Sequence, residues 1–167
     1  MLPRALIFIY VSLTSVSVCA GEIQDAYFKR RDVNDFRTLG DYKIEEIGLE
    51  RTSCYGSCPA YTIKMKADGS IVYSGGEHAK VQGVKSASID EETFTKIASF
   101  IKQIGYVYMS DSFNSPVSDN STTYTYIKFN GQFKYIRNYA NSGPIALWAV
   151  EQLIDKQIDR MVLQGER

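Results

Sequence analysis

Two cysteines, Cys54 and Cys58, stand four residues apart and are the side chains of this sequence best suited to covalent chemistry. At this spacing one turn of chain brings the two Cα atoms to about 6 Å, which lies within disulfide range. A bridge that closes so short a loop gains only about 2 kcal/mol from chain entropy, so it would hold the loop locally. We therefore predict a structural disulfide between Cys54 and Cys58.

The same cysteines leave open a second interpretation, thiol-redox chemistry or copper handling. The pattern Cys-xxx-Cys-Pro resembles the site of thioredoxin-like copper-delivery proteins, in which two thiolates and a distant histidine hold copper. Only His78 could complete that set here. However, residues 61–66 alternate with period two, whereas a thioredoxin-like site needs a helix to lower the cysteine pKa. A zinc site would also lack a fourth ligand, so we predict no metal and no cofactor.

Motifs of hydrolytic and phosphoryl-transfer enzymes are missing from the sequence. It has no Gly-x-Ser-x-Gly elbow and no phosphate-cradling glycine loop, and a Ser-His-Asp triad would depend on His78 alone. Asp111 and Asp119 could form a carboxylate pair, but both fall in a polar segment where aspartate usually serves turn geometry. Missing motifs do not exclude an enzyme; we name no catalytic residue and favour a protein that binds.

Three tyrosines are candidates for a binding surface. Tyr55 lies at the tip of the cysteine loop, and Tyr124 and Tyr126 share one face of a predicted hairpin. Exposed tyrosines provide rigid amphipathic contact area at small entropic cost, which is how many binding surfaces are built. The alternative is that these rings pack beneath helices or shield a sheet edge.

Arg51, immediately before the cysteine loop, is the fourth binding candidate. Its guanidinium could hold a bound anion. It could instead pair with a neighbouring acid such as Glu50 or Asp119, and the sequence leaves both alternatives open.

The overall composition restricts the function classes. Nineteen lysines and arginines balance nineteen aspartates and glutamates, and the sequence pI is about 6.6. No bulk positive field exists to hold a polyanion, so we expect no nucleic-acid partner. The 167 residues suffice for one domain with a hydrophobic core, and 12 Tyr and 8 Phe against one Trp favour β structure.

The first twenty residues are typical of a secretory signal peptide. One positive charge at Arg4 precedes an apolar run over residues 5–11, and small residues lead to Ala20. The apolar run is too short for a membrane span. Cys19 would permit a lipoprotein, but Val18 is bulky where lipid-modifying peptidases prefer small residues, so we favour cleavage after Ala20. We predict a periplasmic or secreted protein.

Beyond the signal peptide we expect a leader or linker over residues 21–43, with or without a short helix at 33–39, and one domain over residues 44–163. Its first strand spans residues 44–52, and two hairpins follow with Asp-Gly and Asn-Gly turns at 68–69 and 130–131. For both turns we predict a three-residue loop with a glycine bulge, at Gly69 and Gly131. A further strand or an extended loop at 79–84 and an irregular connection at 109–120 complete the non-helical part.

The bulged loops specify which residues pair, because a shift of one residue turns every side chain to the opposite face. In the first hairpin the prediction pairs Met65 with Ile71 and Ile63 with Tyr73. In the second it pairs Ile127 with Phe133 and turns Lys128 and Lys134 to solvent.

Two helices are predicted from apolar residues at spacings of three and four. The first begins after Asp90, a capping residue, and ends at Gly105. The second begins at Pro144 and has its apolar stripe from Leu147 to Met161. The fold class is therefore α+β, an antiparallel sheet built from hairpins with two helices packed on one face.

The segment from Leu49 to Tyr61, with Cys-Tyr-Gly-Ser-Cys-Pro at its centre, resembles the opening of the bacterial family catalogued as domain of unknown function 6438. Later matches to that family are Ser118-Asp119, Thr122-Thr123, Asn130-Gly131, Ile154-Asp155 and Ile158-Asp159. The resemblance covers about residues 44–161. It implies a small exported domain without an established activity.

Together these observations predict an exported, disulfide-stapled binding protein, of the kind represented by inhibitors and immunity proteins. We expect its partner to be an envelope or secreted protein. The oligomeric state is left open by the sequence.

Overall fold

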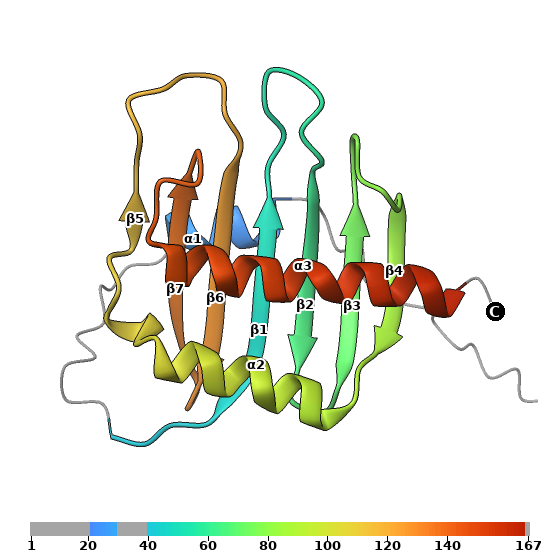
Figure 1. Ribbon diagram of the computed structural model, residues 1–167, viewed down its shortest axis with the longest axis vertical. Helices are drawn as coiled ribbons and strands as arrows, with labels where there is room; N and C mark the ends of the chain where they lie inside the picture. The colour runs from blue at the N-terminus through green and yellow to red at the C-terminus, as the bar shows by residue number, and fades with distance from the viewer. Residues whose placement is uncertain (1–20, 30–39, 166–167) are drawn as a thin grey trace, which may run out of the picture.

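The computed structural model describes residues 21–29 and 40–165, which form the predicted α+β fold (Figure 1). Its elements are, in chain order, α1 (Glu22–Lys29), β1 (Ile44–Arg51), β2 (Tyr61–Lys66), β3 (Ser70–Gly75), β4 (Gly83–Ser88), α2 (Glu91–Gln103), the short 3-10 helix η1 (Tyr106–Tyr108), β5 (Ser112–Phe113), β6 (Thr122–Phe129), β7 (Gln132–Tyr139) and α3 (Ile145–Gly165).

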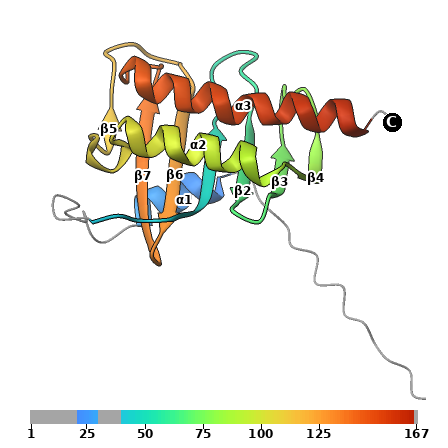
Figure 2. The same cartoon turned by 60° about the horizontal axis from the view of Figure 1, so that its bottom comes forward.

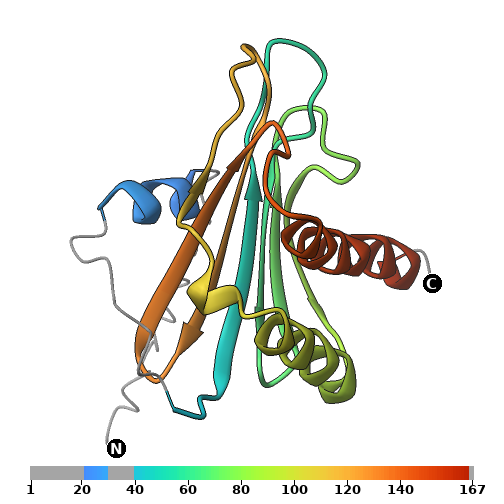
Figure 3. The same cartoon turned by 60° about the vertical axis from the view of Figure 1, so that its left-hand side comes forward.

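The strands form one sheet in the order β4-β3-β2-β1-β6-β7-β5, so β1 lies at its centre. All neighbours are antiparallel except β5 and β7. Helices α2 and α3 cover one face, as predicted, and α1 lies on the opposite face (Figures 2 and 3). The main core fills the space between the sheet and the α2–α3 layer, with Ile63, Met65, Ile101 and Ile154 fully buried.

The first hairpin, β2–β3, has the predicted register. Met65 pairs with Ile71 and Ile63 with Tyr73, and all four side chains are buried in the main core. Gly69 has φ +83°, the left-handed conformation that the bulged loop requires and that glycine adopts without strain. The prediction is confirmed because one apolar face is sufficient to select this register.

The second hairpin, β6–β7, differs from the prediction by one residue. Ile127 pairs with Lys134, not with Phe133. The turn contains only Asn130 and Gly131, both with positive φ (49° and 72°), which suits the twist of the flanking strands.

The physical reason for this shift is the second covered face of the sheet. With the observed register Tyr126 lies opposite Tyr135, and both belong to the aromatic cluster under α1. Lys134 then lies on the main-core side, where it is buried and donates to the Met109 carbonyl (2.7 Å) instead of facing solvent; Lys128 is partly buried. The prediction assumed only one apolar face.

Both predicted helices are present. The Asp90 carboxylate caps α2 by accepting from the Thr93 backbone N–H (2.7 Å), and Gly105 at φ +67° follows its end. Helix α3 begins directly after Pro144 and buries Leu147 among its apolar stripe. Strand β4 occupies residues 83–88, later than the expected 79–84, and the irregular connection 109–120 contains β5.

The predicted signal peptide and the optional helix at 33–39 lie outside the described residues. Within the segment expected to be a leader or linker, α1 packs against the sheet, where Ile23 and Tyr27 are buried against Tyr124 and Tyr126. In the part of the chain that the structure describes, none of the helices has the length and apolar character needed to cross a bilayer.

Candidate functional site

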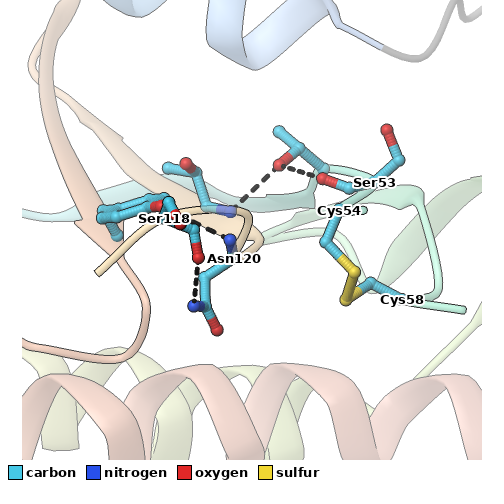
Figure 4. Close-up of a disulfide and its surroundings, with 8 residues drawn as sticks. Ser53, Cys54, Cys58, Ser118 and Asn120 are labelled. Atoms are coloured by element: carbon cyan, nitrogen blue, oxygen red, sulfur yellow. Dashed lines mark hydrogen bonds between the residues drawn. A yellow bond between two sulfur atoms is a disulfide. The ribbon is translucent and has the colours of Figure 1, made fainter. Parts of the chain in front are cut away.

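Residues 52–60, which we call the disulfide loop, join β1 to β2 at one end of the sheet. The predicted Cys54–Cys58 disulfide is present, with the two Cα atoms 5.5 Å apart (Figure 4). Inside the ring the Gly56 N–H donates to the Cys54 carbonyl (2.9 Å). One covalent bond and one hydrogen bond therefore hold this short segment.

Tyr55 lies within the ring and is 91% exposed. So exposed an aromatic ring adds almost nothing to the stability of the fold, because its apolar surface stays in water. The same ring is free to contact another molecule. That Tyr55 contacts a partner stays a prediction.

One side of the disulfide loop is held by the segment before β6. The Thr52 N–H donates to the Thr122 carbonyl (3.0 Å), and the Thr122 N–H donates to the Thr52 hydroxyl (2.9 Å). Figure 4 shows Asn120 of this segment beside the loop. The start of the loop is therefore an extension of the β1–β6 ladder.

The other side of the loop is held by residues 76–82, which connect β3 to β4. The Ala60 N–H donates to the Glu77 carbonyl (2.9 Å), and the Gly76 N–H donates to the Ala60 carbonyl (2.8 Å). His78 belongs to this connection and has φ +55°. Among residues 21–29 and 40–165, no three His, Cys, Asp or Glu side chains gather closely enough to hold a metal ion.

Arg51, the last residue of β1, points from the centre of the sheet to helix α3. Its Nη2 donates to Asp155 Oδ2 (2.7 Å), its Nε lies 3.2 Å from the same oxygen, and its Nη1 donates to the Thr123 hydroxyl (2.7 Å). Only 14% of the side chain is exposed. The partner of Arg51 is thus a helix carboxylate 104 residues away, neither Glu50 nor Asp119.

Tyr61, the first residue of β2, completes this contact from the other side of the disulfide loop. Its hydroxyl donates to Asp155 Oδ1 (2.6 Å) and accepts from Arg51 Nε (3.0 Å). Burial lowers the pKa of Arg51, but the Asp155 carboxylate more than compensates and raises it above its ordinary value. Burial and the same carboxylate raise the pKa of the Tyr61 hydroxyl. Both ends of the loop are therefore held to one point on α3.

Glu151 lies one turn before Asp155 on α3 and is fully buried. Its Oε1 accepts from the Asn138 amide (2.8 Å), while Oε2 has no hydrogen bond and lies 3.8 Å from Arg51 Nη2. Burial raises the pKa of this carboxyl, against the opposing effects of Asn138 and Arg51. We call Arg51, Tyr61, Glu151 and Asp155 the buried anchor.

Tyr124 and Tyr126 share one face of the second hairpin, as predicted, and both are buried under α1. The Tyr126 hydroxyl donates to Glu46, and its ring lies over Gly48, where a Cβ atom would collide with it. Burial and the hydrogen bond to Glu46 raise the pKa of Tyr126. These two rings therefore attach α1 to the sheet.

Glu50 of β1 also attaches α1 to the sheet. Its Oε2 accepts from the backbone N–H groups of Ile23 (2.9 Å) and Gln24 (3.1 Å) at the start of α1. A carboxylate is favourable at this end of a helix because the first N–H groups have no partners within the helix. Burial nevertheless raises the pKa of Glu50.

The aspartates considered as a carboxylate pair have separate surroundings. Asp111 forms an ion pair with Lys134 and its backbone carbonyl accepts from the Arg137 N–H (2.9 Å). Asp119 lies in the connection before β6 with φ +62°.

Sequence reasoning missed three members of the buried anchor: Tyr61, Glu151 and Asp155. One signal was available, because Glu151 stands between Val150 and Ile154 in the apolar stripe of α3. A carboxylate at such a position must have a buried partner. The sequence does not say which of the many basic residues supplies it.

Residues 45–158 match the family described as Domain of unknown function (DUF6438), which is more than half of the chain. The chain belongs to this family. The DUF6438 match begins at β1, after α1, and includes the whole disulfide loop and all four residues of the buried anchor. No curated protein matches the chain.

Proposed function

We propose that this DUF6438 protein is an exported binding protein of the inhibitor or immunity type, and that its partner is an envelope or secreted protein. The contact surface is the disulfide loop, with Tyr55 at its tip. The observation that carries the proposal is a 91% exposed tyrosine inside a loop closed by a disulfide. Stability does not require this ring, so binding is the better explanation for its position.

The rigid support of the loop favours binding in a second way. Ordering a flexible loop upon association costs free energy, and a loop that is already ordered avoids that cost. Here the disulfide closes the loop, and the buried anchor holds both of its ends through Arg51 and Tyr61. We assign contact with the partner to Tyr55 and support of the disulfide loop to Arg51, whereas Tyr124 and Tyr126 hold α1 on the opposite face of the sheet.

Export is part of the proposal. It is supported by the signal-peptide pattern of residues 1–20 and by the disulfide, since disulfides persist in oxidising compartments outside the cytoplasm.

The test is capture of a partner from envelope extract with immobilised wild-type protein and two variants. Tyr55→Ala removes the ring at the loop tip, and we expect it to abolish capture of any protein that binds there. Tyr108→Ala is the matched control, because Tyr108 is also exposed (58%) but lies in η1, at the end of α2. Equal capture by wild type and Tyr55→Ala would reject the proposed surface. Both variants should keep the wild-type unfolding free energy within about 0.5 kcal/mol.

Titration of free thiols distinguishes binding from the thiol-redox alternative that uses Cys54, Cys58 and His78. For a structural disulfide we expect no thiols from Cys54 and Cys58 unless reductant and denaturant are added. Thiols that stay reduced in the native protein, or that take up one equivalent of copper, would support the redox class instead.

A further inference from the structure

Glu50 of β1 is a buried carboxylate bonded to the first residues of α1. Only 3% of the residue is exposed, and its Oε2 accepts from the backbone N–H groups of Ile23 and Gln24. The Gly21 backbone N–H also hydrogen-bonds to this carboxylate. Among residues 21–29 and 40–165, no lysine or arginine forms an ion pair with Glu50. A buried charge is costly unless it is paired as well as hydrogen-bonded, so this carboxylate calls for a cation.

Gly21 is the first residue after the predicted cleavage point at Ala20. It also opens α1, because its carbonyl accepts from the Asp25 N–H (2.8 Å). Hydrolysis of the Ala20–Gly21 peptide bond consumes one water and leaves a carboxylate on Ala20 and an amine on Gly21. An α-amine has an ordinary pKa of about 7.7–8.0 and is protonated at neutral pH. The neutral amide nitrogen beside Glu50 in the precursor thus becomes a cation in the mature protein.

We propose that Glu50 binds the amino terminus that export creates, through an ion pair between its carboxylate and the Gly21 ammonium. This inference rests on the export that forms part of the proposed function. The ion pair gives the buried carboxylate its counter-charge and holds α1 on the sheet more tightly in the mature protein than in the precursor. Only cleavage after Ala20 puts the charge on this nitrogen, because each further residue moves the amine by about 3.8 Å along the chain.

The start of a helix makes the carboxylate necessary. This end of a helix carries partial positive charge, so an ammonium is unfavourable there unless an anion lies beside it. The other titratable groups around the contact come from α1, β2, β6 and β7 and are Glu22, Asp25, Tyr27, Lys64, Tyr124 and Arg137. The two cations among them have other partners, because Lys64 pairs with Glu22 (2.6 Å) and Arg137 interacts with the Tyr124 hydroxyl.

The pKa of the terminal amine tests the ion pair directly. One protein begins at Gly21, and a second retains Ala20; both are released from a fusion partner by a protease that leaves no extra residue. Because a carboxylate favours the charged form, the Gly21 amine should bind its proton at least about tenfold more tightly than an ordinary α-amine. The variant Glu50→Gln, which keeps an acceptor oxygen without the charge, should return the amine to its ordinary pKa. NMR titration of the ¹⁵N-labelled amine measures both, and an ordinary pKa in the wild type overturns the proposal.

Amide hydrogen exchange tests whether the ion pair holds α1. At pH 7 the Ile23 and Gln24 amides should exchange at least about tenfold more slowly in the protein that begins at Gly21 than in the one that retains Ala20. With Glu50→Gln the two chain starts should exchange alike, whether or not α1 stays on the sheet. Equal exchange in the wild-type pair, or a difference that persists with Glu50→Gln, overturns the proposal.

The mass of the exported protein separates this inference from the proposed binding surface. A mature chain that begins at Gly21 supports the ion pair, and one that begins at any other residue overturns it, even if capture through Tyr55 succeeds. Equal capture by wild type and Tyr55→Ala rejects the binding surface alone. A protein that keeps residues 1–20 in the cell would reject both export and the ion pair.

Discussion

Arg51 and Tyr55 lie four residues apart and have opposite surroundings. Arg51 is 14% exposed and bonded to a strand, a tyrosine hydroxyl and helix α3, whereas Tyr55 is 91% exposed at the tip of the disulfide loop. We therefore expect the buried anchor to stabilise the fold and the exposed Tyr55 ring to contribute little to its stability. This separation should allow Tyr55 to be substituted without loss of the fold.

The largest expected effect comes from breaking the buried anchor. Arg51→Ala leaves the Asp155 and Glu151 carboxylates without their cation, and we expect it to destabilise the protein by about 3–5 kcal/mol. Chemical denaturation measures this difference. Lys80→Ala is the matched control, since Lys80 also pairs with a carboxylate of α3, Asp159, but both partners are exposed (66% and 61%). Its loss should cost less than about 1 kcal/mol, and equal losses would show that burial of the anchor does not matter.

A smaller effect is expected from opening the loop. The double variant Cys54→Ser, Cys58→Ser should lose about 2 kcal/mol, because the disulfide restricts only a short loop in the unfolded chain. The comparison is urea unfolding of the two oxidised proteins. Added reductant should destabilise the wild type and leave the double variant unchanged. A loss as large as that of Arg51→Ala would mean that the loop, and not the anchor, is the main support.

The smallest effect concerns the proton on Glu151. Burial raises the pKa of Glu151 in the folded state above the 4.5 of an unperturbed glutamate, so the folded protein binds the proton more tightly than the unfolded chain. Stability should therefore fall as the pH rises from about 4.5 through the folded-state pKa, by at most about 1.4 kcal/mol per pH unit from this group.

Unfolding curves of wild type and Glu151→Gln between pH 4 and pH 7 isolate this contribution, because Glu50 also has a raised pKa and is present in both proteins. The pH dependence should be weaker in Glu151→Gln. Identical slopes for the two proteins would show that Glu151 does not change its protonation on folding.

The parts of the fold that sequence reasoning predicted are those determined by nearby residues. The Asp90 cap, the spacing of the apolar residues in α2 and the Gly69 turn are each specified by one short stretch of sequence, and all three are confirmed. The predicted β6–β7 register was wrong because the observed register depends on α1, which lies about a hundred residues earlier in the chain. The alternating pattern of β6 indicates two faces but not that both are covered.

For the candidate site the same distinction holds. The disulfide followed from two cysteines four residues apart, because short chain segments have few conformations and their closure can be judged locally. The residues near Arg51 in the sequence did not indicate its partner, since Asp155 is 104 residues away and several acids are nearer in sequence. By itself, the sequence determined the fold class, both main helices, the first hairpin and the disulfide. Only the tertiary structure decided which tyrosines are buried and which acid holds Arg51, because burial is set by segments that meet in space and are far apart along the chain.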